Sequence, residues 1–125
     1  MGTNHALSPL RPADFDGITL RKPGVWLVDF STAWCAPCRV LTPLLAQLAT
    51  ELTGTLSIAG IDCDDEPELA QRFGVTAMPT LLLFRDGRVI AQKVGAMPRA
   101  RLLAWLASSG IAISAGAAAP ARPAF

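Results

Sequence analysis

The stretch Val25-Trp26-Leu27-Val28-Asp29-Phe30 is followed, after three residues, by Trp34-Cys35-Ala36-Pro37-Cys38. A helix-like pattern then runs from Arg39 to Leu52. A nearly unbroken apolar run of strand length predicts a central strand that is covered on both faces. Two cysteines separated by two residues lie within disulfide reach when the second sits in the first turn of a helix. The order of strand, dithiol and helix therefore predicts a disulfide that can close at a helix N-terminus.

The position of the first cysteine favours its thiolate form. Unpaired N–H groups and the positive end of the helix dipole stabilise an anion at a helix start, and a free thiol with a pKa of about 8.5 is otherwise mostly protonated at neutral pH. Pro37 is compatible with the first turn, where its missing N–H is not needed. We therefore expect Cys35 to be the attacking thiol and Cys38, one turn further in and more buried, the resolving thiol. A structural disulfide is the alternative.

The Cys-x-x-Cys spacing also occurs in half of a zinc site or in an inert buried pair. Zinc requires about four ligands, and the remaining candidates are Cys63 and the only histidine, His5. No second pair of ligands follows the first, so the pattern favours redox chemistry and no metal is expected. Cys63 follows Ile61 on one face of a predicted strand, which indicates a buried thiol with a raised pKa rather than a third redox group.

Composition limits the class of protein. The chain has 125 residues, of which 51% are hydrophobic and 17% charged, as expected for one compact domain with an apolar core. The net charge of +1 indicates neither nucleic acid nor an anionic membrane as a partner. No run approaches the roughly 18 apolar residues that span a bilayer, and Met1–Leu10 lacks the basic start of a secretory signal. Three cysteines do not make a secreted disulfide framework, so we expect a cytoplasmic protein.

Further elements follow from periodicity and turn residues. Apolar spacings of three and four residues indicate an amphipathic helix up to Leu52, with Pro43 inside it and Gly54 at its end. The other predicted elements are a strand at Leu56–Cys63, a short helix from Asp64 to Phe73, strands at Thr80–Phe84 and Arg88–Val94, and a helix at Pro98–Ser108. Asp86-Gly87 is a hairpin signal, so the last two strands are expected to be antiparallel.

Strands that alternate with helices and end in a hairpin indicate an α/β fold with a mixed sheet. We expect residues 1–18 to form an N-terminal arm, which leaves residues 19–110 as the domain. Asp14–Leu20 is expected to hold a short helix or an edge strand. Residues 111–125 are rich in alanine and proline and are expected to form a mobile tail.

Several motifs resemble the thioredoxin family in order and spacing. They are Val28-Asp29-Phe30, Trp34-Cys35-Ala36-Pro37-Cys38, Pro43, Ala77-Met78-Pro79-Thr80 and Gly95. The resemblance spans about Thr19 to Gly110. It implies the thioredoxin fold, a central mixed β-sheet flanked by helices on both faces. It also implies protein-disulfide reduction through a redox-active disulfide of Cys35 and Cys38, with no bound cofactor.

Asp29 interrupts an apolar strand. Burying a carboxyl is costly unless it is paired or protonated, and desolvation raises its pKa. In the family that this chain resembles, the matching carboxyl assists proton transfer to and from the buried cysteine, which implies a catalytic role for Asp29. A hydrogen-bonded structural aspartate is the alternative.

The resemblance also implies a surface for substrates. Its residues are Trp34, Ala36, Pro37, Met78, Pro79 and Gly95. Met78-Pro79 resembles the cis-proline loop of the family, which pairs its backbone with an extended partner segment. Trp34 is expected to shield the sulfur and offer a flat apolar surface, with a plain core tryptophan as the alternative.

The partners implied are disulfide-bearing proteins and an NADPH-dependent flavoprotein thioredoxin reductase, with the chain itself a monomer. Three residues depart from the family pattern: Ser31 replaces a usual tryptophan, Ala36 a usual glycine, and Gly60 a lysine that commonly neighbours the buried aspartate. Without that lysine, the pKa of Asp29 is expected to be higher than is normal for the family. A binding or chaperone-like module on the same fold is the alternative function.

Overall fold

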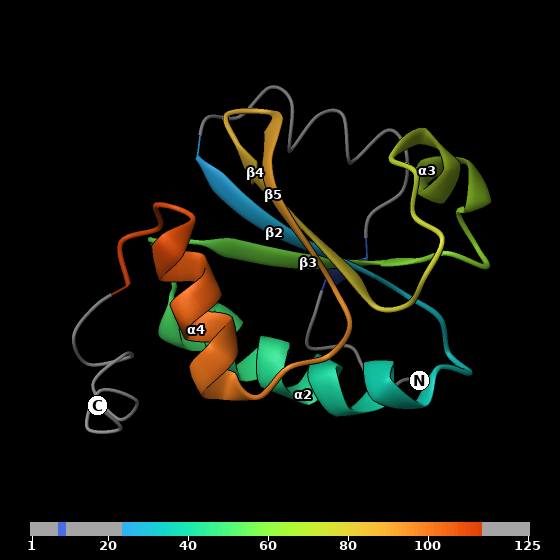
Figure 1. The fold of residues 1–125 in the computed structure, drawn as a ribbon, viewed down its shortest axis with the longest axis horizontal. Coiled ribbons are helices and arrows are strands. Elements are labelled where there is room, and N and C mark those ends of the chain that lie inside the picture. The colour runs from blue at the N-terminus through green and yellow to red at the C-terminus, as the bar shows by residue number, and fades with distance from the viewer. Residues whose placement is uncertain (1–7, 10–23, 114–125) are drawn as a thin grey trace.

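The computed structural model describes residues 8–9 and 24–113, which form a five-stranded sheet with helices on both faces (Figure 1). Its elements are β1 (Ser8–Pro9), β2 (Val25–Ser31), α2 (Ala36–Glu51), β3 (Ser57–Asp62), α3 (Pro67–Arg72), β4 (Thr80–Arg85), β5 (Arg88–Val94) and α4 (Arg99–Ser108). The strand order is β1-β3-β2-β4-β5. β3 is parallel to β1 and β2, whereas β4 is antiparallel to β2 and β5. The predicted mixed sheet and antiparallel hairpin are confirmed.

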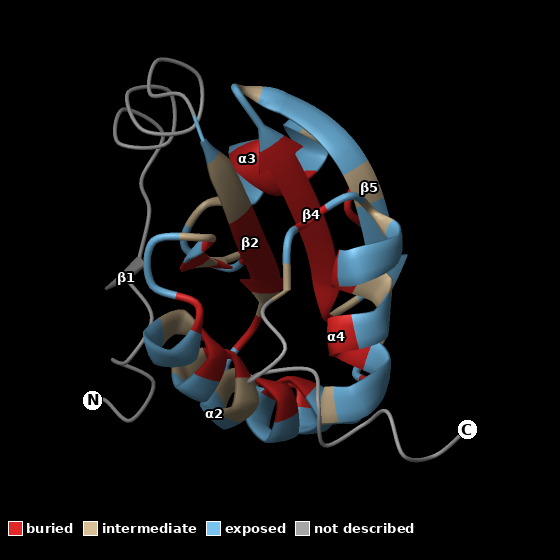
Figure 2. Cartoon of the chain, turned by 90° about the vertical axis from the view of Figure 1, so that its left-hand side faces the viewer, coloured by how far each residue is buried: buried red, intermediate tan, exposed pale blue. Residues whose placement is uncertain are grey.

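Alternating side chains divide the core between the two faces of the sheet. Leu27 of β2 and Leu81 of β4 pack with α2 and α4. Their neighbours Val28 and Leu82 pack with α3 on the other face. Because successive strand residues point to opposite faces, an unbroken apolar run is needed where both faces are covered. Figure 2 shows β2 and β4 buried between the helices, while β5 is largely exposed.

Helix α2 begins at Ala36, three residues before the start indicated by its apolar periodicity. Its buried side chains are Cys38, Leu41, Leu45 and Leu48. The first turn has no large apolar side chains at helical spacing, so the apolar periodicity of the sequence does not detect it. Pro43 lies inside the helix on its exposed side.

Described residues outside both expected boundaries of the domain contact it. Within the expected arm, Ser8–Pro9 pair with Ala59 and Gly60 of β3. At the other end, Gly110 has φ +93° and Ile111 donates its N–H to the carbonyl oxygen of Leu106 at 3.1 Å. This is a Schellman ending, which folds the residue after the glycine back onto its own helix. Ile111 is therefore buried, and residues 10–18 and 114–125 lie outside the described residues.

The expected helix or edge strand at Asp14–Leu20 also lies outside the described residues. Among the residues that are described, no helix combines the length and the apolar character that crossing a membrane requires.

Candidate active site

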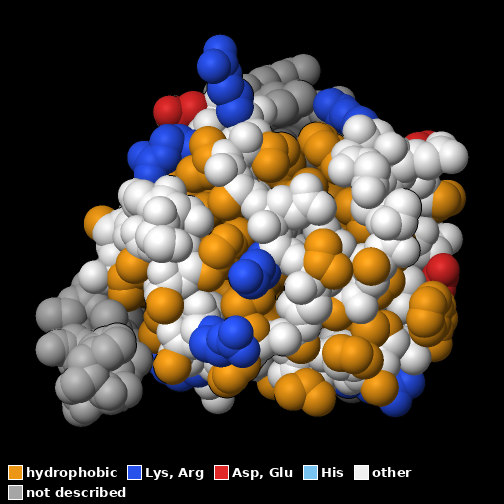
Figure 3. Space-filling view, in the orientation of Figure 1, with side chains coloured by type: hydrophobic (Ala, Val, Ile, Leu, Met, Phe, Trp, Pro, Cys, Tyr) orange, Lys and Arg blue, Asp and Glu red, His pale blue; other side chains and the backbone are white. Residues whose placement is uncertain are grey.

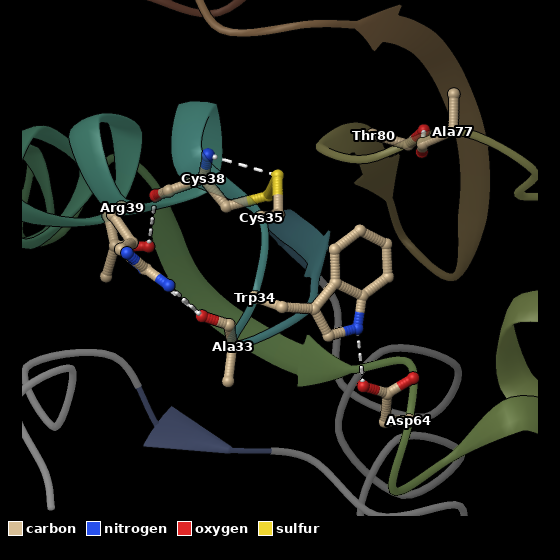
Figure 4. Close-up of a disulfide and its surroundings, with 9 residues drawn as sticks. Ala33, Trp34, Cys35, Cys38, Arg39, Asp64, Ala77 and Thr80 are labelled. Atoms are coloured by element: carbon tan, nitrogen blue, oxygen red, sulfur yellow. Dashed lines mark hydrogen bonds between the residues drawn. A yellow bond between two sulfur atoms is a disulfide. The ribbon is translucent and has the colours of Figure 1, made fainter.

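The dithiol lies at the N-terminus of α2, as its spacing predicts. Cys35 is the N-cap of the helix and forms a disulfide with Cys38, with 5.3 Å between the two Cα atoms. The N–H of Cys38 donates to Sγ of Cys35 at 3.3 Å (Figure 4). The first-turn N–H that caps this sulfur is placed to stabilise a thiolate on Cys35 once the disulfide opens.

The two sulfur-bearing residues differ in accessibility in the expected order. Cys35 is 5% exposed and Cys38 is 2% exposed. Ala36 and Pro37, which lie between them, are both exposed. Cys35 is therefore mostly buried, and a substrate disulfide that reaches its sulfur must also contact the exposed residues beside it.

Two sets of hydrogen bonds hold the loop that precedes α2. The N–H of Cys35 donates to the carbonyl oxygen of Thr32 at 3.3 Å. The guanidinium group of Arg39 donates from two nitrogens to the carbonyl oxygen of Ala33, at 3.2 and 3.1 Å. Arg39 thereby ties the strand-to-helix loop to the helix that follows it, and hydrogen bonds to the carbonyl oxygens of Thr32 and Ala33 hold the loop that carries the dithiol.

Trp34 is an exposed residue, not a core tryptophan. Its side chain is 67% exposed, and its indole Nε1–H donates to Oδ2 of Asp64 at 2.9 Å. Figure 4 shows the ring beside Cys35, with its N–H directed at the carboxylate. Sequence reasoning missed Asp64, because the acidic run that contains it also fits a helix start. The hydrogen bond holds a large apolar ring at the surface next to the dithiol.

Asp29 occupies the middle of β2 and is only 1% exposed. In the sheet it lies between Gly60 of β3 and Leu81 of β4. Leu81 packs with α2, so Asp29 projects toward the layer in which Cys38 is buried. Burial raises the pKa of Asp29 to about 7. Its Oδ1 has no hydrogen-bond partner among the described residues, which argues against a structural carboxylate with both oxygens satisfied.

The loop before β4 contains the Met78–Pro79 peptide bond, which is cis. Thr80 pairs with Phe30, so the start of β4 lies beside the end of β2, where the dithiol loop begins. Gly95 donates its N–H to the carbonyl oxygen of Pro79 at 2.8 Å. Met78 is half-buried against the core on the α3 side. The structure therefore brings Gly95 and Pro79 together at the end of the sheet where β2 leads into the dithiol loop.

Cys63 is buried and free, as expected from its place after Ile61. Burial raises the pKa of Cys63 to about 11, with further increases from the carboxylates of Asp62, Asp29 and Asp64. A thiol with this pKa is almost entirely protonated at neutral pH and is a poor nucleophile. Within residues 8–9 and 24–113, His, Cys, Asp and Glu side chains do not gather in threes as metal ligands do, and His5 lies outside these ranges.

Comparison with known proteins identifies the family. The family model described as Thioredoxin matches residues 6–108. The chain belongs to the thioredoxin family. It is 40% identical over 97 residues to thioredoxin of Rhodospirillum rubrum, a match that covers 78% of this chain and 93% of that protein.

Other relatives give the same result. Thioredoxin of Haemophilus influenzae is 38% identical over 93 residues, covering 74% of this chain and 87% of the relative. Thioredoxin of Mycobacterium tuberculosis is 44% identical over 88 residues, covering 70% and 74%.

Together with the disulfide of Cys35 and Cys38, membership of the thioredoxin family shows a thiol–disulfide oxidoreductase that reduces disulfide-bearing proteins. The expected fold and family are confirmed. Neither the comparisons nor the described structure favours the alternative of a binding or chaperone-like module.

Proposed function

We propose that Cys35 and Cys38 act in a fixed order. The thiolate of Cys35 attacks one sulfur of a substrate disulfide, forms a mixed disulfide and releases the other substrate sulfur as a thiolate. The thiolate of Cys38 then attacks Sγ of Cys35, which closes the intramolecular disulfide and releases the second substrate thiolate. The substrate gains two electrons and two protons. The observation that carries this order is the N–H of Cys38 directed at Sγ of Cys35 at a helix start.

Asp29 is the proposed proton acceptor for Cys38. A general base works best when its pKa lies near the operating pH, and burial raises the pKa of Asp29 to about 7. The carboxyl projects toward the layer that holds Cys38, and its Oδ1 is unpartnered among the described residues. These features support proton transfer better than a purely structural role.

Substrate proteins are proposed to bind around the dithiol, where Trp34, Ala36 and Pro37 are exposed, Met78 and Gly95 are half-buried, and Pro79 is buried. This surface comprises Trp34, Ala36, Pro37, Met78, Pro79 and Gly95. The exposed ring of Trp34 gives apolar contact area, and the loop at Pro79 leads directly into β4. An extended substrate segment that pairs with backbone groups of this loop is recognised with little dependence on its side chains.

The remaining partners follow from family membership. We propose that an NADPH-dependent flavoprotein thioredoxin reductase returns the disulfide to the dithiol. The protein is proposed to act as a cytoplasmic monomer without a bound cofactor, and without nucleic-acid or membrane partners.

Reduction of insulin by dithiothreitol tests the proposed site. Acceleration of insulin precipitation is expected for the wild-type protein and for Cys63→Ala, because Cys63 takes no part in exchange. The double variant Cys35→Ser/Cys38→Ser is expected to show only the background rate. An accelerated rate with the double variant contradicts the assignment of the dithiol.

A further inference from the structure

An open groove of about 550 Å³ lies between β5 and α4, next to the proposed substrate surface. We call it the β5–α4 groove, and its lining residues are Lys93, Val94, Gly95, Ala96, Met97, Arg101, Ala104, Trp105 and Ser108. Gly95 is shared with the proposed substrate surface, and its N–H bonds to the carbonyl oxygen of Pro79. The groove thus continues from the loop beside the dithiol.

The two walls of the groove are set by strand register and helix periodicity. Lys93 pairs with Leu81, whose side chain packs on the face covered by α4, so Lys93 projects from that same face. Arg101 belongs to a single face of α4, because it is followed at helical spacing by the lining residues Ala104, Trp105 and Ser108. One cation therefore stands on each wall.

The lining combines positive charge with exposed apolar area. Ala96 and Ala104 are exposed, and the indole of Trp105 is half-buried. Figure 3 shows the face that carries α4 and β5, where Lys and Arg side chains stand on a largely hydrophobic and uncharged surface. The lining contains no Asp or Glu.

The two cations differ from their neighbour Arg99 in pairing. Arg99 forms a salt bridge with Glu51. Within the described part of the chain, neither Lys93 nor Arg101 forms an ion pair. Their charge is therefore available to a partner, although the net charge of the whole chain is only +1.

We propose that the β5–α4 groove binds an extended acidic segment of substrate proteins, with apolar side chains beside the carboxylates. Carboxylates complement Lys93 and Arg101, and apolar neighbours cover Ala104 and Trp105. The inference rests on the proposed reductase function, because the groove continues the substrate surface through Gly95. Such charge complementarity acts mainly on the rate of encounter and on the choice of partner.

Matched peptides test the groove. Each peptide contains one disulfide with a three-residue segment of Glu, Gln or Lys placed before or after it, and reduction by the dithiol form is measured at low and high salt. The better-placed acidic peptide is expected to react roughly threefold to tenfold faster than its Gln counterpart at low salt. The preference is expected to shrink at high salt, because exposed charges are screened.

Charge-reversed variants test whether the preference for the acidic peptide depends on the two cations of the groove. Lys93→Glu and Arg101→Glu are each expected to reduce the preference for the acidic peptide. Arg88→Glu makes the same charge change at the other end of β5, on an exposed residue outside the groove, and is expected to retain the preference. Equal rates for the Glu and Gln peptides, or an equal loss with Arg88→Glu, overturn the proposal.

A cysteine-free acidic peptide separates this inference from the proposed function. With ¹⁵N-labelled protein, chemical-shift changes are expected at Lys93, Gly95 and the indole N–H of Trp105. Failure of insulin reduction with these shifts present contradicts the reductase assignment and retains the groove. Three results overturn the groove proposal: shifts confined to other residues, the same shifts with inorganic phosphate alone, or the same shifts on concentrating the protein without peptide.

Discussion

Asp29 and Gly60 lie side by side in the parallel register of β2 and β3. The carboxyl is buried and its pKa is raised to about 7, while the neighbouring position contributes no side chain at all. Gly60 is also the position at which the sequence departs from the lysine of the thioredoxin pattern that it resembles. Because Gly60 is paired with Asp29, the absence of a lysine at position 60 leaves the proposed proton acceptor without a neighbouring positive charge from this position.

Introducing a cation at Gly60 is expected to lower the pKa of Asp29. A positive charge within about 4–6 Å stabilises a carboxylate and lowers its pKa by about 1 unit or more. In Gly60→Lys, the acidic limb of the pH–rate profile for insulin reduction is therefore expected to move to lower pH. Gly60→Met is the matched control, because it adds a chain of similar length without charge. An identical shift in both variants, or in neither, contradicts the electrostatic explanation.

Asp29→Asn is expected to stabilise the fold at alkaline pH. The folded carboxyl holds its proton up to about pH 7, whereas the ordinary pKa is 3.8, so the folded state binds more protons than the unfolded state between these values. Wild-type stability therefore falls as pH rises through this window and stays low above it. The difference in pKa corresponds to roughly 4 kcal/mol.

Urea unfolding of the oxidised proteins measures the effect of Asp29→Asn. Its gain in free energy of unfolding over wild type is expected to be larger at about pH 8 than at about pH 4, by up to that amount. Asn does not titrate, so the change with pH belongs to the wild-type carboxyl. A gain of equal size at both pH values contradicts a buried carboxyl with a raised pKa.

The order of attack makes the two cysteines unequal. In Cys38→Ser, Cys35 can still attack a substrate disulfide, but no neighbouring thiolate resolves the mixed disulfide, so a covalent adduct is expected to accumulate. In Cys35→Ser, the inner Cys38 is 2% exposed and is expected to trap little. Each variant is incubated with a disulfide-bearing protein, quenched with an alkylating agent and compared on non-reducing gels. Adducts that form equally with both variants, or only with Cys35→Ser, overturn the role assignment.

Cys63 is expected to react slowly with alkylating agents. It is 7% exposed and its pKa is raised to about 11, so little thiolate is present and little of it is accessible. Thiol counting on the oxidised native protein is expected to find one slow thiol, which becomes fast after denaturation. Rapid alkylation of Cys63 in the native protein contradicts its buried position.

The sequence alone determined the features that depend on residues close together along the chain. The Cys-x-x-Cys spacing and the helical pattern after it predicted a closable disulfide at a helix start, and the structure has Cys35 as the N-cap of α2. The hairpin at Asp86-Gly87 was predictable because turn geometry is set by adjacent residues. Cys63 was predictable as a buried thiol, because strand alternation places it on the same face as Ile61.

Only the tertiary structure decided the contacts between distant segments. The hydrogen bond from Trp34 to Asp64 joins residues 30 positions apart, and the register that sets Gly60 beside Asp29 depends on how β2 and β3 pair. Ile111 is buried because a Schellman ending turns it back onto α4. The β5–α4 groove places Lys93 of one element and Arg101 of another on its two walls. Local propensity carries no information about such pairings, since they form only when the packing of the whole core selects one arrangement.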